Sequence, residues 1–252
     1  MNNFPFEKSS LPVLGVDEQA EKVYGIGTCT LAHLDDGRNF LINCAHTINT
    51  WGESPIYIAL PIGRSIELPF ALKSKSKTVD KLDIAVTPLD GEFGAHFYDN
   101  DLTSNSLIDK PIPNKYKNLP KRVVFFGYPA SRANIDLKAK RINSKSIAIV
   151  GIEVESVSEK TLETYDIDLA THLLASFSIG KMKDQNNKMK RAPKPNGISG
   201  GAVYIAYVEE GKGIDSLVAI DFVGIGTEYL QNISRLKATR KAAIADFIKS
   251  SF

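Results

Sequence analysis

The stretch Asn196-Gly197-Ile198-Ser199-Gly200-Gly201-Ala202-Val203 places one serine among three glycines and leads into an apolar run. Glycine lets the backbone turn tightly and approach a ligand closely, so a serine at such a turn can direct its hydroxyl into a cleft. The amides of Gly197 and Ser199 would then converge on one point, as in an oxyanion hole. A glycine-rich hairpin before a strand gives the same pattern. Because a serine is a weak nucleophile without a base, a histidine and a carboxylate are needed elsewhere in the chain.

Two other motifs supply those groups. Asn43-Cys44-Ala45-His46-Thr47 ends one apolar run, and Lys81-Leu82-Asp83-Ile84-Ala85-Val86 places an acid at the head of another. With these three stretches together, the chain resembles the trypsin- and chymotrypsin-like serine peptidases. It is most similar to the compact bacterial members, whose motifs read T-N-A-H, D-[IL]-A-[VL] and G-x-S-G-G. The resemblance extends from about residue 24 to the C-terminal helix.

The resemblance implies an all-β fold of two six-stranded antiparallel β-barrels with a C-terminal helix. In that family the serine attacks a carbonyl, the histidine takes and returns the proton, and the aspartate orients the imidazole and stabilises its charged form. These roles fall on Ser199, His46 and Asp83, and the backbone amides of Gly197 and Ser199 form the oxyanion hole. Each also has an ordinary explanation, since a histidine after an apolar strand is often structural and an aspartate there is often a cap or turn residue.

The resemblance also implies which residues surround the substrate. Thr227 corresponds to a small hydroxyl residue that is hydrogen-bonded to the triad carboxylate, although it could be an ordinary strand threonine. The resemblance places the floor of the substrate pocket six residues before the nucleophile, at the uncharged Pro193. It places Glu228 and Tyr229, which follow Thr227 in the chain, at the entrance of this pocket. Because an unpaired buried charge is costly, we expect small, apolar or acidic side chains rather than Lys or Arg before the cleaved bond. An insertion in the preceding loop, or Glu228 turning inward, would change that expectation.

The division of the chain follows from the same motifs. Residues 1–22 are expected to be a polar lead-in, 23–100 the first barrel with His46 and Asp83, 101–121 a proline-bearing linker, and 122–252 the second barrel with Ser199 and the C-terminal helix. No helical period of useful length occurs in the first half. The terminal helix is expected after Ser234 as its N-cap. A basic loop at 181–194 is either a solvated loop or a mobile element that regulates the site.

Composition limits the partners and the compartment. A net charge of +2 over 252 residues gives no case for nucleic acid or a membrane surface. The chain contains no run of 18 apolar residues, and its first 24 residues lack the pattern of a signal peptide, so we expect a cytoplasmic protein. With two cysteines, no zinc-type spacing and no nucleotide-type glycine loop, we expect neither a metal nor a cofactor. The expected partners are a protein or peptide substrate and an activating partner protein.

Cys29 and Cys44 are the two cysteines, and so few cysteines suit a reducing compartment. Asp36-Gly37 suits a two-residue type I′ turn between the flanking strands. In that register Cys29 faces Cys44 directly, because the numbers of each facing pair add up to 73. We expect both to be thiols that act as small core residues.

One departure from the family bears on activation. Ile198 stands where secreted trypsin-like enzymes carry an aspartate that pairs with a new N-terminus after cleavage, so activation by trimming is not supported. Three functions remain open at this point. They are an endopeptidase, a non-catalytic binding module on the same fold, and a regulated protease whose activity awaits a partner protein.

Overall fold

The computed structural model describes residues 8–252 except 18, 53, 62, 70, 75–80, 99, 137–140, 178–181, 184–188, 191–193 and 213. Side chains are described for the same residues other than 132–136, 141–143, 182–183, 189–190 and 215. In the described residues, no helix is long and apolar enough to cross a membrane.

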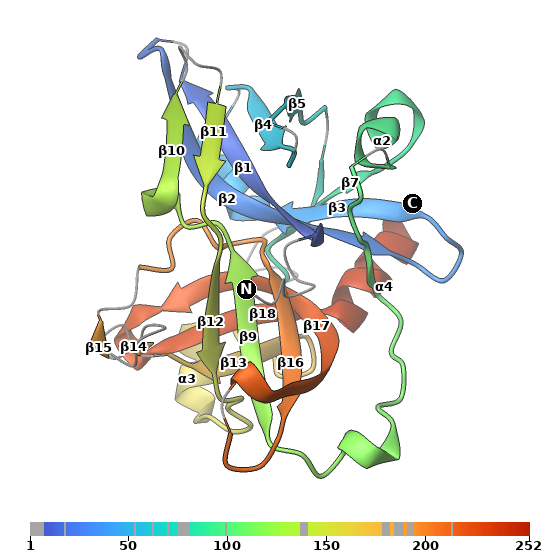
Figure 1. Ribbon diagram of the computed structural model, residues 1–252, viewed down its shortest axis with the longest axis vertical. Coiled ribbons are helices and arrows are strands. Elements are labelled where there is room, and N and C mark those ends of the chain that lie inside the picture. Colours follow the sequence, from blue (N-terminus) through green and yellow to red (C-terminus); the bar gives the residue numbers. More distant parts are fainter. Residues whose placement is uncertain are drawn as a thin grey trace.

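The protein is mostly β and consists of two curled antiparallel sheets that follow one another along the chain (Figure 1). The first sheet has the strand order β5-β4-β1-β2-β3-β7-β6, and β8 pairs in parallel with β2. Its strands are β1 (Ser10–Asp17), β2 (Lys22–His33), β3 (Asn39–Cys44), β4 (Ile56–Ala59), β5 (Ser65–Glu67), β6 (Leu72–Lys73), β7 (Ile84–Pro88) and β8 (Asn105–Ser106).

The second sheet has six strands in the order β12-β9-β16-β17-β18-β13. They are β9 (Lys121–Gly127), β12 (Ile147–Gly151), β13 (His172–Ser176), β16 (Ala202–Val208), β17 (Leu217–Leu230) and β18 (Arg235–Arg240). Two small hairpins pair β10 (Ala133–Asp136) with β11 (Arg141–Ser144) and β14 (Met182–Lys183) with β15 (Met189–Lys190). The described residues contain four α-helices, which are α1 (Ala45–Trp51), α2 (Gly91–Tyr98), α3 (Glu159–Thr164) and α4 (Lys241–Ser251).

The two sheets share one hydrophobic core. Phe40 and Ile84 of the first half pack there with Phe126 and Ile225 of the second half and with Ile244 of α4. Each sheet also has an apolar cluster of its own, around Leu31 and Ile58 in the first half and around Phe125 and Leu173 in the second. Because burial of apolar surface drives such packing, the shared core fixes the two sheets against each other. The predicted all-β fold with a C-terminal helix is confirmed. The two predicted six-stranded barrels are two curled sheets, the first with seven strands and β8 and the second with six strands.

Three features of the secondary structure differ from the sequence predictions. Residues 10–17 are not an irregular lead-in but form the buried strand β1, which pairs with β2 and β4. The first half contains α1 and α2, whose seven and eight residues are too short to show a clear helical period. The terminal helix starts at Lys241 rather than after Ser234, because Ser234 has a left-handed φ of 51° and β18 follows it.

The first hairpin has a three-residue loop, so the register predicted for the cysteines is wrong by one residue. Leu34 pairs with Arg38 across the loop, and Gly37 closes it with a φ of 84°. Facing pairs of β2 and β3 therefore add up to 72, as for Thr30 and Ile42. A one-residue slip turns a side chain to the other face. Cys29 accordingly packs in the first sheet's own cluster and Cys44 in the shared core, both as buried free thiols.

We expect both thiols to resist a maleimide reagent in the native protein and to react fully after unfolding. Neither side chain is exposed, and burial raises the pKa of the Cys29 thiol, which keeps the reactive thiolate scarce. Mass spectrometry before and after denaturation would count the modified cysteines. Rapid labelling of the native protein would contradict this burial.

Candidate active site

The nucleophile turn requires glycine on both sides of Ser199. Gly197 and Gly200 have φ values of 93° and 85°, in the left-handed region that other residues avoid. A Cβ atom on Gly200 would clash with the carbonyl oxygen of Thr28, and one on Gly197 with the amide of Ala130. The turn therefore holds Ser199, which is half-buried, just before β16 and against the first sheet.

The amides of Gly197 and Ser199 belong to residues that line the cleft. The carbonyl of Asn196 accepts a hydrogen bond from the Ala130 amide at 3.0 Å. A trans peptide points its carbonyl and the following amide in opposite directions, so the Gly197 amide faces away from Ala130. In the hydrogen bonds found among the described residues, the amides of Gly197 and Ser199 are not donors. Both residues line the same cleft. An oxyanion hole formed by these two amides stays a prediction.

Two threonines of β2 hold this turn from the first sheet. The Thr28 hydroxyl donates to the Gly197 carbonyl at 2.9 Å and accepts from the Tyr128 amide at 2.9 Å. The Thr30 hydroxyl donates to the Gly200 carbonyl at 2.8 Å. Ile198 adds apolar packing in the second sheet's cluster, so hydrogen bonds and apolar contacts hold the turn. The sequence analysis missed both threonines, although their two-residue spacing on one strand face was a signal.

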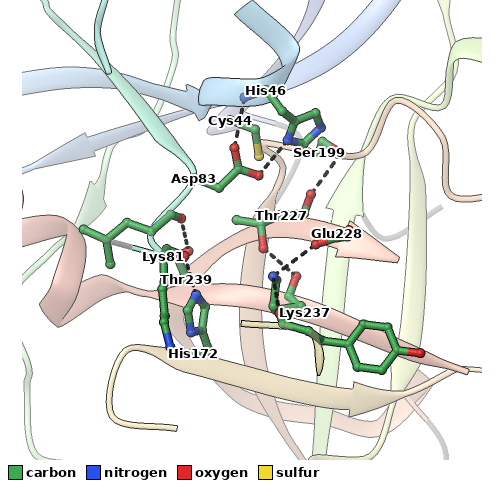
Figure 2. Close-up of polar contacts among 12 residues, drawn as sticks. Cys44, His46, Lys81, Asp83, His172, Ser199, Thr227, Glu228, Lys237 and Thr239 are labelled. Atoms are coloured by element: carbon green, nitrogen blue, oxygen red, sulfur yellow. Dashed lines mark hydrogen bonds and ion pairs between the residues drawn. The ribbon is translucent and has the colours of Figure 1, made fainter. Parts of the chain in front are cut away.

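Asp83 and His46 form a bonded pair at neighbouring strand ends. Asp83 precedes β7 and His46 is the second residue of α1, which follows β3, and β3 and β7 are adjacent strands. One carboxylate oxygen of Asp83 lies 2.6 Å from Nδ1 of His46, and the other accepts the His46 amide at 2.9 Å (Figure 2). The Asp83 side chain is 3% exposed and that of His46 is 36% exposed. With Nδ1 donating to Asp83, Nε2 is the nitrogen that can accept a proton.

Ser199 and His46 line one cleft but are not hydrogen-bonded to each other. The cleft has a volume of about 530 Å³, and Figure 2 shows the Ser199 side chain beside the His46 ring. The Ser199 hydroxyl instead donates to the Thr227 carbonyl at 3.3 Å. Catalytic hydrogen bonds are often long or misaligned before substrate binds. The structure therefore brings the three predicted residues together, with the Asp83–His46 half of the arrangement formed.

The predicted bond from the Thr227 hydroxyl to the Asp83 carboxylate is wrong. This hydroxyl donates to the Lys237 carbonyl at 3.3 Å, because the strand pairing is irregular between Gly226 and Glu228 and Thr227 lies at that bulge. Thr227 contributes through its backbone, by accepting from Ser199.

Cys44 lies beside the Asp83–His46 pair. Its sulfur donates to the Gly226 carbonyl at 3.3 Å, and one donor atom each from Cys44, His46 and Asp83 lies within 4.8 Å of the others. Three such atoms are a possible cation site. However, Cys44 is fully buried, and both its sulfur and the His46 Nδ1 already bond to protein groups. Within the described residues, Cys44 therefore packs against the Asp83–His46 pair and its sulfur supports the neighbouring backbone.

A second, much smaller cavity adjoins Ser199. Its volume is about 20 Å³, which is room for about one water molecule. Its walls are formed by Phe125, Pro195, Ile198, Ser199, Gly226, Thr227, Glu228, Tyr229, Leu236 and Lys237. The Tyr229 ring packs edge-on against Phe177, with 5.4 Å between ring centroids. The predicted pocket residues Glu228 and Tyr229 line both this cavity and the larger cleft, and Pro193 lies outside the described residues.

The charge of Glu228 is already paired. Its carboxylate lies 3.0 Å from the ammonium group of Lys237, whose side chain is 3% exposed. The same ammonium donates to the Tyr165 carbonyl at 3.4 Å. Glu228 is therefore engaged by a buried cation of the protein itself, which the sequence pattern did not indicate.

Comparison with known proteins gives likenesses in structure only. No family model and no curated protein sequence matches the chain. Among solved structures, the serine protease domain of the Sesbania mosaic virus polyprotein is similar at 12% identity and a TM-score of 0.47, over 94% of this chain and 91% of that one. The MamO protease domain of Magnetospirillum magneticum is similar at 13% identity and a TM-score of 0.44, over 98% and 97%. Sequence identities and TM-scores this low do not establish an activity for this chain.

Proposed function

We propose that this protein is a serine endopeptidase that cleaves protein or peptide substrates. The observation that carries the proposal is the 2.6 Å bond between Asp83 and His46 at the wall of the cleft that also contains Ser199. A buried carboxylate that fixes one imidazole nitrogen and leaves the other toward a serine is the arrangement required for general-base activation of a hydroxyl.

The residues would act in a defined order. The Ser199 hydroxyl leaves the Thr227 carbonyl, gives its proton to Nε2 of His46 and attacks the substrate carbonyl carbon. The amides of Gly197 and Ser199 donate to the oxygen that becomes negative. His46 then protonates the leaving amine, and the acyl group stays on Ser199 until water, activated by the same imidazole, releases it. Asp83 stabilises the imidazolium in both halves of the reaction.

The test is covalent labelling by a fluorophosphonate, which reacts with activated serines. We expect the folded protein to be modified at Ser199, as mapped by mass spectrometry, and the heat-unfolded protein not to react. Labelling should also disappear in a His46→Ala variant, since the hydroxyl then has no base. A folded protein that stays unlabelled would overturn the proposal.

A non-catalytic binding module is the second candidate. It is favoured by the hydrogen bond of the Ser199 hydroxyl to the Thr227 carbonyl instead of to His46. Incubating the protein with a mixture of peptides from a digested proteome, and measuring the peptide masses afterwards, distinguishes the two functions. A binding module would retain peptides of unchanged mass, whereas a peptidase would release shortened ones.

Regulation by a partner protein is a further part of the proposal. The small cavity beside Ser199 and the bond of its hydroxyl to Thr227 together fit a resting form that awaits a trigger. Comparing fluorophosphonate labelling of the isolated protein with labelling in a cell lysate tests this. Equal extents of labelling would contradict a partner requirement.

Cleavage after Lys or Arg should be a minor activity. The cavity beside Ser199 has room for about one water molecule, and Glu228 is already paired with Lys237. A basic side chain would therefore enter without a partner charge, which is costly. We expect small side chains to be favoured before the cleaved bond in a peptide library read by mass spectrometry. A Tyr229→Ala variant should admit larger apolar ones, and dominant cleavage after Arg by the unmodified protein would contradict this assignment.

A further inference from the structure

The segment that carries Asp83 has an unusual backbone. Lys81 and Asp83 have φ values of 61° and 54°, both in the left-handed region. Residues other than glycine occupy this region at an energetic cost and remain there when surrounding groups hold them. The segment precedes β7 of the first sheet, so its conformation decides where the Asp83 carboxylate lies relative to His46.

Two side chains of the second sheet bind this segment. Nε2 of His172 lies 2.8 Å from the Lys81 carbonyl oxygen, and the Thr239 hydroxyl donates to the Leu82 carbonyl at 2.6 Å (Figure 2). His172 and Thr239 face each other across β13 and β18. Both are fully buried. Neither belongs to the catalytic cleft, and His172 belongs to none of the three sequence motifs.

The surroundings of His172 make its Nε2 the donor. Nδ1 accepts the Asp168 amide at 3.1 Å, which requires that nitrogen to lack a proton. Nδ1 also lies 3.1 Å from the Asp168 carbonyl and 3.2 Å from the Thr171 hydroxyl. Burial and the nearby charge of Lys237 lower the pKa of His172, which favours the neutral ring. A neutral imidazole with its proton on Nε2 donates to the Lys81 carbonyl.

We propose that His172 and Thr239 are positioning residues for the active site, acting from the second sheet on the aspartate of the first. They hold the carbonyls of two successive residues, while the carbonyl of Asp83 itself accepts the Ala45 amide at 3.2 Å. Three carbonyls in a row are thus fixed, which locks the left-handed turns at Lys81 and Asp83. The consequence for catalysis rests on the proposed peptidase function, whereas the consequence for the Asp83–His46 bond does not.

The expected effect follows from the distance sensitivity of that bond. Asp83 and His46 are joined at 2.6 Å, and hydrogen bonds weaken steeply when their geometry is disturbed. A displacement of about 1 Å can cost about 100-fold in rate. Removing one holding group should therefore lower kcat by about 10- to 100-fold, with little change in KM because neither residue lines the substrate cleft.

The experiment compares variants that keep or remove one hydrogen-bond donor. Thr239→Val preserves shape and lacks the hydroxyl, while Thr239→Ser keeps it and is the matched control. His172→Leu and His172→Gln form the same contrast, since the glutamine amide can still donate. Thr239→Cys, with a weak donor, serves if the valine variant does not fold. We expect a low kcat for Thr239→Val and His172→Leu. The kcat should be near normal for Thr239→Ser and His172→Gln, and intermediate for Thr239→Cys.

A second readout follows the Asp83–His46 bond without substrate. The proton on Nδ1 of His46 should give a far-downfield NMR resonance in the unmodified protein and in Thr239→Ser. In Thr239→Val this resonance should shift upfield or broaden through exchange. A folded Thr239→Val, or Thr239→Cys, with normal kcat and an unchanged resonance would overturn the proposal. Absence of fluorophosphonate labelling in the unmodified protein would overturn the peptidase function instead, and the resonance would still decide the positioning role.

Discussion

Replacing Ser199 with alanine will lower peptide turnover by about a million-fold, as loss of the nucleophile does in comparable triads, and will leave the fold intact. The hydroxyl makes a single described hydrogen bond, at 3.3 Å to the Thr227 carbonyl, and the glycines around it set the turn. Little stability therefore depends on it, whereas every step of the proposed reaction does. Turnover of a peptide found in the library screen gives the rate, and a thermal unfolding curve checks the fold.

Ser250→Ala is the matched control for this variant. Ser250 is an exposed serine of α4 whose hydroxyl donates to the Phe247 carbonyl at 2.9 Å, far from the cleft in sequence. Its replacement should change neither turnover nor fluorophosphonate labelling. If Ser199→Ala were still labelled to the extent of the unmodified protein, another serine would be the nucleophile.

Asp83→Asn should lower kcat by about 10,000-fold, the size of effect measured when the triad aspartate is replaced in this way in other enzymes. The amide cannot both accept from the His46 backbone and ring and stabilise an imidazolium, and it favours the wrong tautomer. Asparagine tolerates the left-handed φ of 54° at this position, so the backbone should persist. Steady-state kinetics on the same peptide, with circular dichroism for the fold, measure the effect.

Asp90→Asn serves as the control because Asp90 is an exposed acid at the other end of β7 from Asp83 and does not line the cleft. Its turnover should match that of the unmodified protein. A loss at Asp90 with near-normal turnover at Asp83 would move the carboxylate role to the other acid and remove the basis of the proposed triad.

The elements of the site that could be predicted from sequence are those set by local chemistry. Gly197 and Gly200 predict a turn because only glycine fits at these two positions. A histidine or an acid next to an apolar run is predicted to lie near the end of a strand. The resemblance of three widely separated motifs to those of serine peptidases predicted that Ser199, His46 and Asp83 lie together. The structure places Ser199 and His46 at one cleft and bonds Asp83 to His46.

The supporting residues could not be predicted in this way because their roles depend on which strand faces which. Four such residues look like ordinary strand residues in the sequence, namely Thr28, Thr30, His172 and Thr239. Their hydrogen-bond partners are backbone carbonyls in the other half of the protein. The cysteine register failed for a related reason. Asp36-Gly37 suits both a two-residue and a three-residue loop, and the side chain of Asp36 bonding to Arg38 accompanies the longer one.

The reciprocal support between the two sheets has a consequence for the chain as it is being made. The serine turn of the second sheet is held by threonines of the first, and the aspartate segment of the first sheet is held by His172 and Thr239 of the second. A nascent or truncated chain that lacks β18 therefore has a loosely held aspartate even when the serine is present. In the proposed peptidase, full activity therefore requires both sheets to be folded, and neither half of the protein is expected to be active by itself.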